Sequence, residues 1–143
     1  MRPSRLAIPA VVALLALGGC SSLFGPPESP IKVGECSGPL TGTTVSKIPT
    51  VSCATAHNWE AYAHKNVADS ATYPGVEAMK TEADAFCSAE FETFIGTSYD
   101  DSDLDLQMLY PIADSWAKKD REIICLVGLD AGGITGSLKG TQR

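Results

Sequence analysis

Five cysteines and two histidines are the side chains of this sequence best suited to covalent or metal chemistry. Cys53 and His57 are four residues apart and His64 follows, an arrangement that raises the question of a zinc site. Zinc sites built on cysteine usually contain paired Cys-x-x-Cys spacings, and this sequence has none. We therefore expect no metal and no cofactor, and interpret the cysteines through lipid attachment and disulfide formation.

Cys20 follows a segment with the features of a signal peptide. Arg2 and Arg5 supply positive charge, and an uncharged apolar run covers residues 6–17. This run is too short to cross a bilayer core, which needs about 20 apolar residues, but it suits the apolar part of a signal peptide. Residues 17–20, Leu-Gly-Gly-Cys, resemble the lipobox of bacterial lipoproteins, in which the cysteine thiol receives a diacylglycerol. An ordinary secretory signal or an uncleaved anchor is the alternative.

These features divide the chain into three parts. Residues 1–19 are expected to be a lipoprotein signal peptide, and residues 20–30 a lipidated cysteine with a flexible tether rich in Pro and Ser. Residues 31–143 are expected to form one domain outside the cytoplasm. Lipid on Cys20 would hold this domain at the cytoplasmic membrane.

The chain is acidic, with 11 Lys and Arg against 17 Asp and Glu, a net charge of -6. Removal of Arg2 and Arg5 with the signal peptide would leave nine cations against 17 acids, a net charge of -8. A domain of this charge is poorly suited to nucleic acid, teichoic acid or anionic lipid headgroups. We therefore expect no nucleic-acid partner.

The four cysteines that remain after Cys20 form an even set. In an oxidising compartment such a set predicts two disulfides, for which three pairings exist. We favour Cys36–Cys53, which brackets a turn containing Gly and Pro, and Cys87–Cys125, which would join a helix to a strand. On a loop-entropy model each bridge would contribute about 3–4 kcal/mol to stability.

Hydrophobic patterning predicts one long helix. Apolar side chains recur at spacings of three and four from Val76 to Ile95, Pro74 fits the first turn, and Gly96 fits the position just after the helix. Cys87 falls on the apolar stripe, which is why it can reach a strand beneath the helix.

Alternation of apolar and polar residues predicts the strands. They are expected at residues 43–45, 50–53, 58–67 and 104–110, with the most apolar at 121–129 and an edge strand at 134–138. Residues 114–120 are expected to form a turn or a helical turn. The expected fold class is α+β, a mostly antiparallel sheet with one long packed helix, stapled by two disulfides.

The strand at 58–67 has two different faces. Its alternation would place Trp59, Ala61 and Ala63 on one face and Glu60, Tyr62 and His64 on the other.

Catalytic chemistry has little support, and we expect no catalytic residues. His57 follows Cys53 closely, where bonding to the backbone is the ordinary explanation, and His64 is expected to be exposed. The sequence has no Gly-x-Ser-x-Gly motif. Glu90 and Glu92 lie on the helix but cannot be paired with the second carboxylate that a glycosidase needs. A cell-wall hydrolase is the enzymatic alternative.

An acidic run raises the question of calcium binding. A loop starting at Asp101 would offer oxygen ligands at its first, third and fifth positions, but an EF-hand also needs Gly at the sixth and Glu at the twelfth, where this chain has Leu106 and Ile112. A solvated loop is favoured, with a weak irregular calcium site as the alternative. The run consists of Asp100, Asp101, Asp103 and Asp105.

Trp116 and Arg121, together with Trp59 and Tyr62, are the candidates for an interaction surface, because Trp, Tyr and Arg dominate binding hot spots. The structural alternative is favoured for each. In it Trp116 covers the end of the core, Asp120 and Arg121 bond locally, and the aromatic strand residues are buried.

Many of these residues together resemble the septum-formation domain of actinobacterial envelope proteins. The resembling segments are Val33–Cys36, Cys53 with His57, Glu60–Tyr62, Cys87, Ala89–Phe91, Tyr99–Ser102, Leu109–Pro111, Ser115–Trp116, Asp120–Arg121, Cys125 and Thr135–Gly140. One departure is Lys119, where the family motif usually has Gly before the Asp-Arg pair.

The resemblance implies a domain tethered outside the membrane, with a role in cell division or envelope biogenesis, and implies no particular reaction. The expected function is therefore that of a non-enzymatic lipoprotein, an accessory or interaction factor for an unknown envelope or septal protein. The alternative is a small-molecule binding or sensing module of the cell envelope. That alternative requires a sizeable pocket lined by Trp59, Tyr62 or Trp116.

Overall fold

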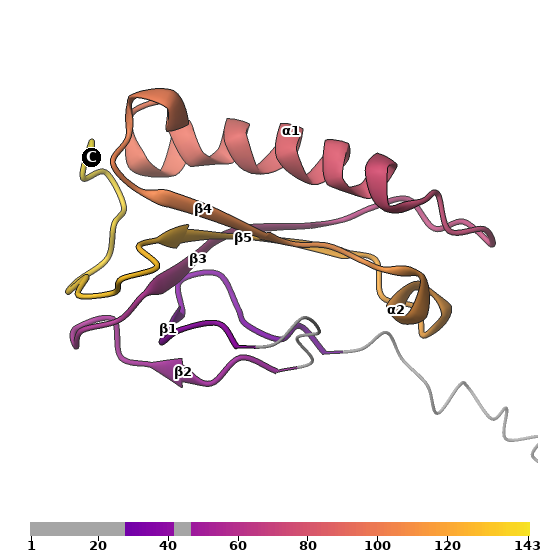
Figure 1. Cartoon of the computed structure of the whole chain (residues 1–143), viewed down its shortest axis with the longest axis horizontal. Helices are drawn as coiled ribbons and strands as arrows, with labels where there is room; N and C mark the ends of the chain where they lie inside the picture. The colour runs from indigo at the N-terminus through magenta and orange to yellow at the C-terminus, as the bar shows by residue number, and fades with distance from the viewer. Residues whose placement is uncertain (1–27, 42–46) are drawn as a thin grey trace, which may run out of the picture.

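The computed structural model describes residues 28–41 and 47–143 (Figure 1). The expected signal peptide, Cys20, most of the tether and the strand expected at 43–45 lie outside the described residues. None of the described helices is both long enough and apolar enough to span a membrane.

A five-stranded antiparallel sheet and one long helix make up the domain, which confirms the α+β prediction. The sheet order is β2-β1-β3-β5-β4. Figure 1 shows α1 on one side of β4 and β5, and the segment that carries β1 and β2 on the other. The elements in chain order are β1 (Cys36–Ser37), β2 (Thr50–Val51), β3 (Trp59–Asn66), α1 (Val76–Ile95), η1 (Tyr99–Asp101), β4 (Asp105–Leu109), α2 (Ala113–Ala117) and β5 (Glu122–Gly128).

Helix α1 buries a stripe that repeats every fourth residue. Its buried side chains are Met79, Ala83, Cys87, Phe91 and Ile95. Such spacing keeps one face of a helix turned toward the sheet. The prediction of this stripe is confirmed, except that its first member, Val76, is 49% exposed.

Two glycines set the ends of α1. Gly75 is the residue before the helix, with φ of 101°, and Gly96 ends it with φ of 92°. Pro74 therefore precedes the helix instead of occupying its first turn, because the non-helical backbone of Gly75 separates the two. The C-terminal segment covers the other end of the helix, where Phe94 and Ile95 offer their carbonyl oxygens to backbone N–H groups of residues 140 and 142.

Strand β5 is buried on both faces, as its apolar sequence predicts. Ile123, Cys125 and Val127 belong to the core beneath α1, which we call the helix-side core. Ile124 and Leu126 belong to a second cluster on the opposite face, which we call the β1-side core.

A bulge in β3 corrects the predicted faces of that strand. Ala61 pairs with Leu126 and Ala63 with Cys125, so Tyr62 is an extra residue opposite β5. The alternation therefore reverses at this point. Ala63 joins the helix-side core with Tyr62, while Trp59 and Ala61 lie in the β1-side core.

Both predicted disulfides are confirmed. Cys87–Cys125 joins α1 to β5 with its Cα atoms 5.5 Å apart, and both residues are fully buried. Cys36–Cys53 joins β1 to the loop after β2 with its Cα atoms 5.2 Å apart. Only the first of the two bridges lies within one of the two core clusters of the described chain, the helix-side core.

The edge strand predicted at residues 134–138 is wrong. Only Ile134 forms a bridge, with His57, and the positive φ of Gly133 and Gly136 interrupts an extended strand. The carboxylate of Glu60 instead accepts hydrogen bonds of 2.7 Å from the Ser137 hydroxyl and the Leu138 N–H. The hydrogen-bond donors of this segment are thus paired with a side chain and not with a neighbouring strand.

Candidate functional site

Trp116 and Arg121 form a plug at one end of the helix-side core. The Arg121 guanidinium lies 3.6 Å from the centroid of the Trp116 ring. It donates hydrogen bonds to the carbonyl oxygens of Trp116 and Asp120 at 2.8 and 2.6 Å, and to Asp69 at 2.9 Å. The indole N–H donates to the carbonyl oxygen of Ser70 at 3.1 Å. These contacts hold the chain before α1 against the junction of α2 and β5.

The three aromatic candidates for an interaction surface are core residues. Trp59, Tyr62 and Trp116 are 3%, 6% and 4% exposed. The Tyr62 hydroxyl donates to the carbonyl oxygen of Cys87 at 2.7 Å. Burial raises the pKa of the Tyr62 phenol well above its ordinary value, and the negative charge of Glu90 raises it further. This burial corrects the idea of a solvent-facing surface built from these side chains, and agrees with the structural interpretation of each.

The two histidines lie in different surroundings. His57 is 2% exposed, and its Nδ1 lies 2.8 Å from the carbonyl oxygen of Thr55. Because a carbonyl oxygen only accepts, this Nδ1 donates and the buried Nε2 is left without a partner among the described residues. His64 lies on the surface with its Nδ1 2.8 Å from the carboxylate of Glu122. Bonding of His57 to the backbone is as predicted.

The acidic run does not converge on one point. Asp101 accepts from the Ser98 hydroxyl at 2.8 Å, Asp103 pairs with Arg143 at 3.0 Å, and Asp105 accepts from a backbone N–H at 3.0 Å. These three carboxylates therefore have separate donors, one in the same loop and two from later segments of the chain.

One group of potential metal ligands is compact in the described part of the chain. It consists of Cys36, Cys53 and Glu60, whose ligand atoms lie within 4.8 Å of one another. Both sulfurs belong to a disulfide, and the carboxylate already accepts two hydrogen bonds. Since thiolates bind metals and disulfide sulfurs do not, this group does not form a metal centre in the oxidised protein.

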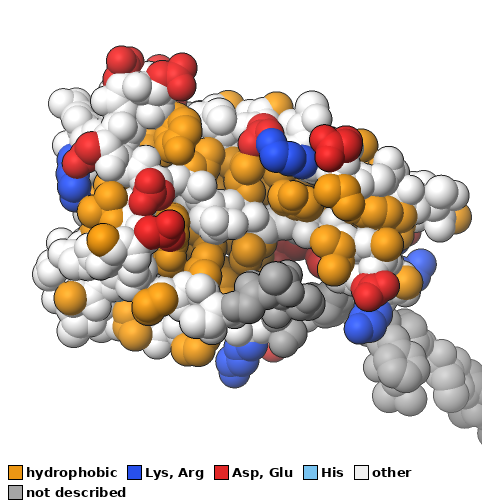
Figure 2. Space-filling view, in the orientation of Figure 1, with side chains coloured by type: hydrophobic (Ala, Val, Ile, Leu, Met, Phe, Trp, Pro, Cys, Tyr) orange, Lys and Arg blue, Asp and Glu red, His pale blue; other side chains and the backbone are white. Residues whose placement is uncertain are grey.

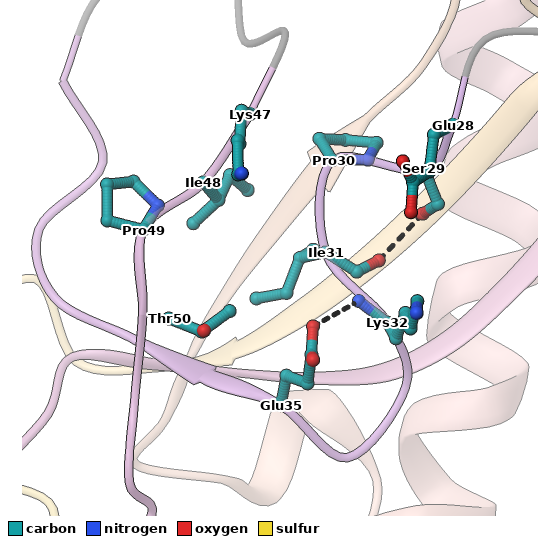
Figure 3. Close-up of a pocket in the computed structure, with 10 residues that line it drawn as sticks. All are labelled: Glu28, Ser29, Pro30, Ile31, Lys32, Glu35, Lys47, Ile48, Pro49 and Thr50. Atoms are coloured by element: carbon teal, nitrogen blue, oxygen red, sulfur yellow. Dashed lines mark hydrogen bonds between the residues drawn. The ribbon is translucent and has the colours of Figure 1, made fainter.

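A pocket of about 250 Å³ lies at the N-terminal end of the described domain (Figure 3). It is lined by residues 28–32, Glu35 and residues 47–50, which belong to two stretches of chain. Ile31 and Ile48 are buried members of the β1-side core. Trp59, Tyr62 and Trp116 do not line this pocket, so it is not the aromatic pocket that the small-molecule alternative requires.

The exposed feature that sequence reasoning missed is the open edge of β4. This strand pairs with β5 on one side and is the last strand of the sheet on the other. The missing information was the strand order, because alternation within 104–110 predicts a strand without showing which neighbours it has.

The backbone at Lys119 explains why the family motif usually has glycine at this position. Its φ is 71°, in the left-handed region that glycine adopts most easily. A glycine at this position in the motif therefore has a conformational reason, and in this chain a lysine adopts the left-handed backbone.

A family model described as septum formation matches residues 33–142, which is most of the chain. The chain has no match among curated proteins or solved structures.

Proposed function

This chain belongs to the septum-formation family, and on that premise we propose that it is a membrane-anchored lipoprotein that serves cell division as a non-enzymatic accessory factor. The match over residues 33–142 is the observation that carries the division role. The lipoprotein part of the proposal rests on the signal-like segment and the Leu-Gly-Gly-Cys sequence at residues 17–20.

The anchor would keep the domain close to the membrane. Ten residues lie between Cys20 and Ile31, the first buried residue of the described domain, so the two are 11 residue-to-residue steps apart. At about 3.3–3.6 Å per residue, a fully extended tether would reach at most about 40 Å. The domain would therefore act on partners at or near the outer face of the membrane.

An interaction role is supported by how the reactive side chains are used. Arg121 is engaged by carbonyl oxygens, a carboxylate and an indole ring, and Glu60 by a hydroxyl and a backbone N–H. Both side chains thereby stabilise the fold. The surface that remains open for recognition includes the backbone of β4.

A deletion strain of the native host tests this proposal. We expect irregular septum spacing in the deletion strain, and restoration by the full-length chain. A Cys20→Ala chain should leave the membrane fraction and restore spacing poorly, whereas Ser21→Ala, a change next to the lipid site, should behave as the wild type. Normal septum spacing in the deletion strain would contradict the division role. Retention of the Cys20→Ala chain in the membrane would contradict lipid anchoring.

A further inference from the structure

We propose that the open edge of β4 is a docking site for an extended, cationic segment of a partner protein. The segment would add to the sheet as a sixth strand, antiparallel to β4. This inference rests on the proposed accessory function and specifies the chemistry of the partner.

The hydrogen-bonding groups of β4 provide the first reason. All five residues of β4 are in antiparallel register with β5, from Asp105 opposite Gly128 to Leu109 opposite Ile124. In an antiparallel strand, alternate residues direct their N–H and C=O groups to opposite sides. The groups directed away from β5 have no strand partner in the described chain. Such a row of donors and acceptors is a template for an added strand.

The other edge of the sheet is a weaker template. Strand β2 has only two residues, Thr50 and Val51, whereas β4 has five. A longer edge offers more backbone hydrogen bonds to an incoming strand.

Strand β4 has few of the features that usually protect an edge. Its one charged residue is Asp105, and the Gln107 amide donates a 3.4 Å hydrogen bond to the Met108 carbonyl oxygen. Its sequence, Asp-Leu-Gln-Met-Leu, contains neither Lys nor Pro, and its register with β5 is continuous, without a bulge. Leu106 and Met108 are partly buried against the helix-side core, so one side of an added strand would meet apolar surface. Tyr99 before the strand and Ile112 after it are 40% and 37% exposed. An added strand with apolar residues at alternate positions fits this surface.

Charge identifies the kind of segment that fits. Figure 2 shows acidic side chains gathered at the end of the molecule where α1 is followed by η1 and β4. Asp100, Asp101, Asp103 and Asp105 are all exposed there, and Arg143 is the one cation in the described chain that forms a salt bridge with them. The full chain also carries a net charge of -6. A cationic segment is therefore attracted to this end of β4.

Strand direction gives the proposal a specific orientation. The four strand pairings of the sheet are antiparallel, and antiparallel pairing is slightly more stable per residue than parallel pairing. The acidic residues lie at the start of β4, so they would meet the C-terminal end of an antiparallel partner. The basic residues of the partner should therefore follow its strand-forming residues. A second copy of this chain fits less well, because it brings the same net negative charge.

The test uses the full-length protein in a non-ionic detergent and fluorescently labelled peptides. The first peptide alternates Thr and Val over eight residues and ends in three lysines. The second has the three lysines at its start, and the third is the first with N-methyl groups on alternate residues. We expect the first peptide to bind, the second to bind about fivefold more weakly, and the third not to bind. Hydrogen exchange should slow at residues 105–109 when the first peptide is bound.

Two matched variants test the position of the charge. Asp100→Lys should weaken binding of the first peptide about two- to fivefold, the size expected of an exposed charge pair. Asp114→Lys makes the same change in net charge in the exposed first turn of α2, which follows the other end of β4, and should leave binding nearly unchanged.

Several results would overturn the proposal. They are no binding of the first peptide, equal binding of the N-methylated peptide, and equal effects of the two lysine variants. Dimerisation through β4 that excludes the peptide would assign the edge to a second copy instead. Failure here is distinguishable from failure of the division role, because septum spacing in the deletion strain does not depend on which surface binds the partner.

Discussion

The two faces of the sheet are built in different ways. The helix-side core contains 15 buried residues of the described chain and a disulfide with both cysteines fully buried. The β1-side core contains six, and the Cys36–Cys53 disulfide lies outside both clusters and includes the partly exposed Cys53. It also borders the pocket between residues 28–35 and 47–50. We infer that most of the folding free energy comes from the helix side.

The edge of β4 and the pocket, the two described surfaces considered above for binding, lie on different sides in this comparison. Strand β4 packs on the larger core through Leu106 and Met108, with buried Leu104 just before it, and on the smaller core through Leu109 alone. The pocket is attached to the smaller core through Ile31 and Ile48. Because a recognition surface works best on a rigid support, the edge of β4 is the better placed of the two to bind a partner.

Removal of each disulfide should give the largest effects. Replacing both Cys87 and Cys125 by Ala should lower the free energy of unfolding by about 4 kcal/mol, and replacing both Cys36 and Cys53 by about 3 kcal/mol, because the first bridge closes the longer loop. The bridges span 38 and 17 residues. Urea denaturation measures both values. A larger loss for the Cys36–Cys53 pair would contradict the loop-length argument.

Truncation of one buried side chain on each face is the next test. Phe91→Ala should cost about 3–4 kcal/mol, because this fully buried ring leaves a large cavity in a packed core. Ile48→Ala should cost about 2 kcal/mol, since its neighbourhood beside the pocket can relax into the space. Equal losses in denaturation experiments would show that the two cores contribute alike.

Removal of the Tyr62 hydroxyl should give a smaller effect that depends on pH. Tyr62→Phe loses the hydrogen bond to Cys87 and should cost about 1 kcal/mol at pH 7. Burial raises the pKa of Tyr62 in the folded protein, whereas an unfolded tyrosine has a pKa of about 10. Above pH 10 the unfolded chain therefore loses a proton that the folded chain keeps, and stability falls as pH rises.

The Phe variant tests that pH dependence directly. Because of Tyr62, the free energy of unfolding should fall by up to about 1.4 kcal/mol per pH unit above pH 10. The Tyr62→Phe variant should lack this part of the fall. Denaturation of both proteins between pH 9 and 11 measures it. Parallel pH profiles would show that Tyr62 does not remain protonated in the helix-side core.

The smallest expected effect concerns the turn that leads from the plug into β5. Lys119→Gly should stabilise the protein by less than about 1 kcal/mol, because relief of the left-handed backbone is partly offset by the greater freedom of glycine in the unfolded chain. Lys118 has φ of -93°, so Lys118→Gly gains no such relief and should be neutral or destabilising. Thermal denaturation of the two variants should therefore show shifts of opposite sign, or a shift for Lys119→Gly alone.

The difference between the two sides of the sheet also explains which features the sequence predicts well. Helix α1, Cys87 on its buried stripe and the apolar strand β5 follow from local periodicity, and the helix-side core is made from them. The disulfide pairing follows from the turn between Cys36 and Cys53 and from the helix-to-strand geometry of the other two cysteines. These features depend mainly on residues near one another in the chain.

Other features depend on contacts that no local pattern contains. The bulge at Tyr62 reverses the faces of β3, and the carboxylate of Glu60 reaches a segment 77 residues away in sequence. Strand order, which leaves β4 at an edge, is likewise a long-range property. Trp116 and Arg121 were recognisable as a plug by their residue types, but the backbone of Ser70 that completes it was not.

The position of the full-length protein in dividing cells tests the central claim most directly. The chain would carry a C-terminal tag that folds outside the membrane, and septa would be marked in the same cells. The proposed division role predicts that the signal concentrates at mid-cell as septa form. An even signal around the envelope throughout the division cycle would contradict it.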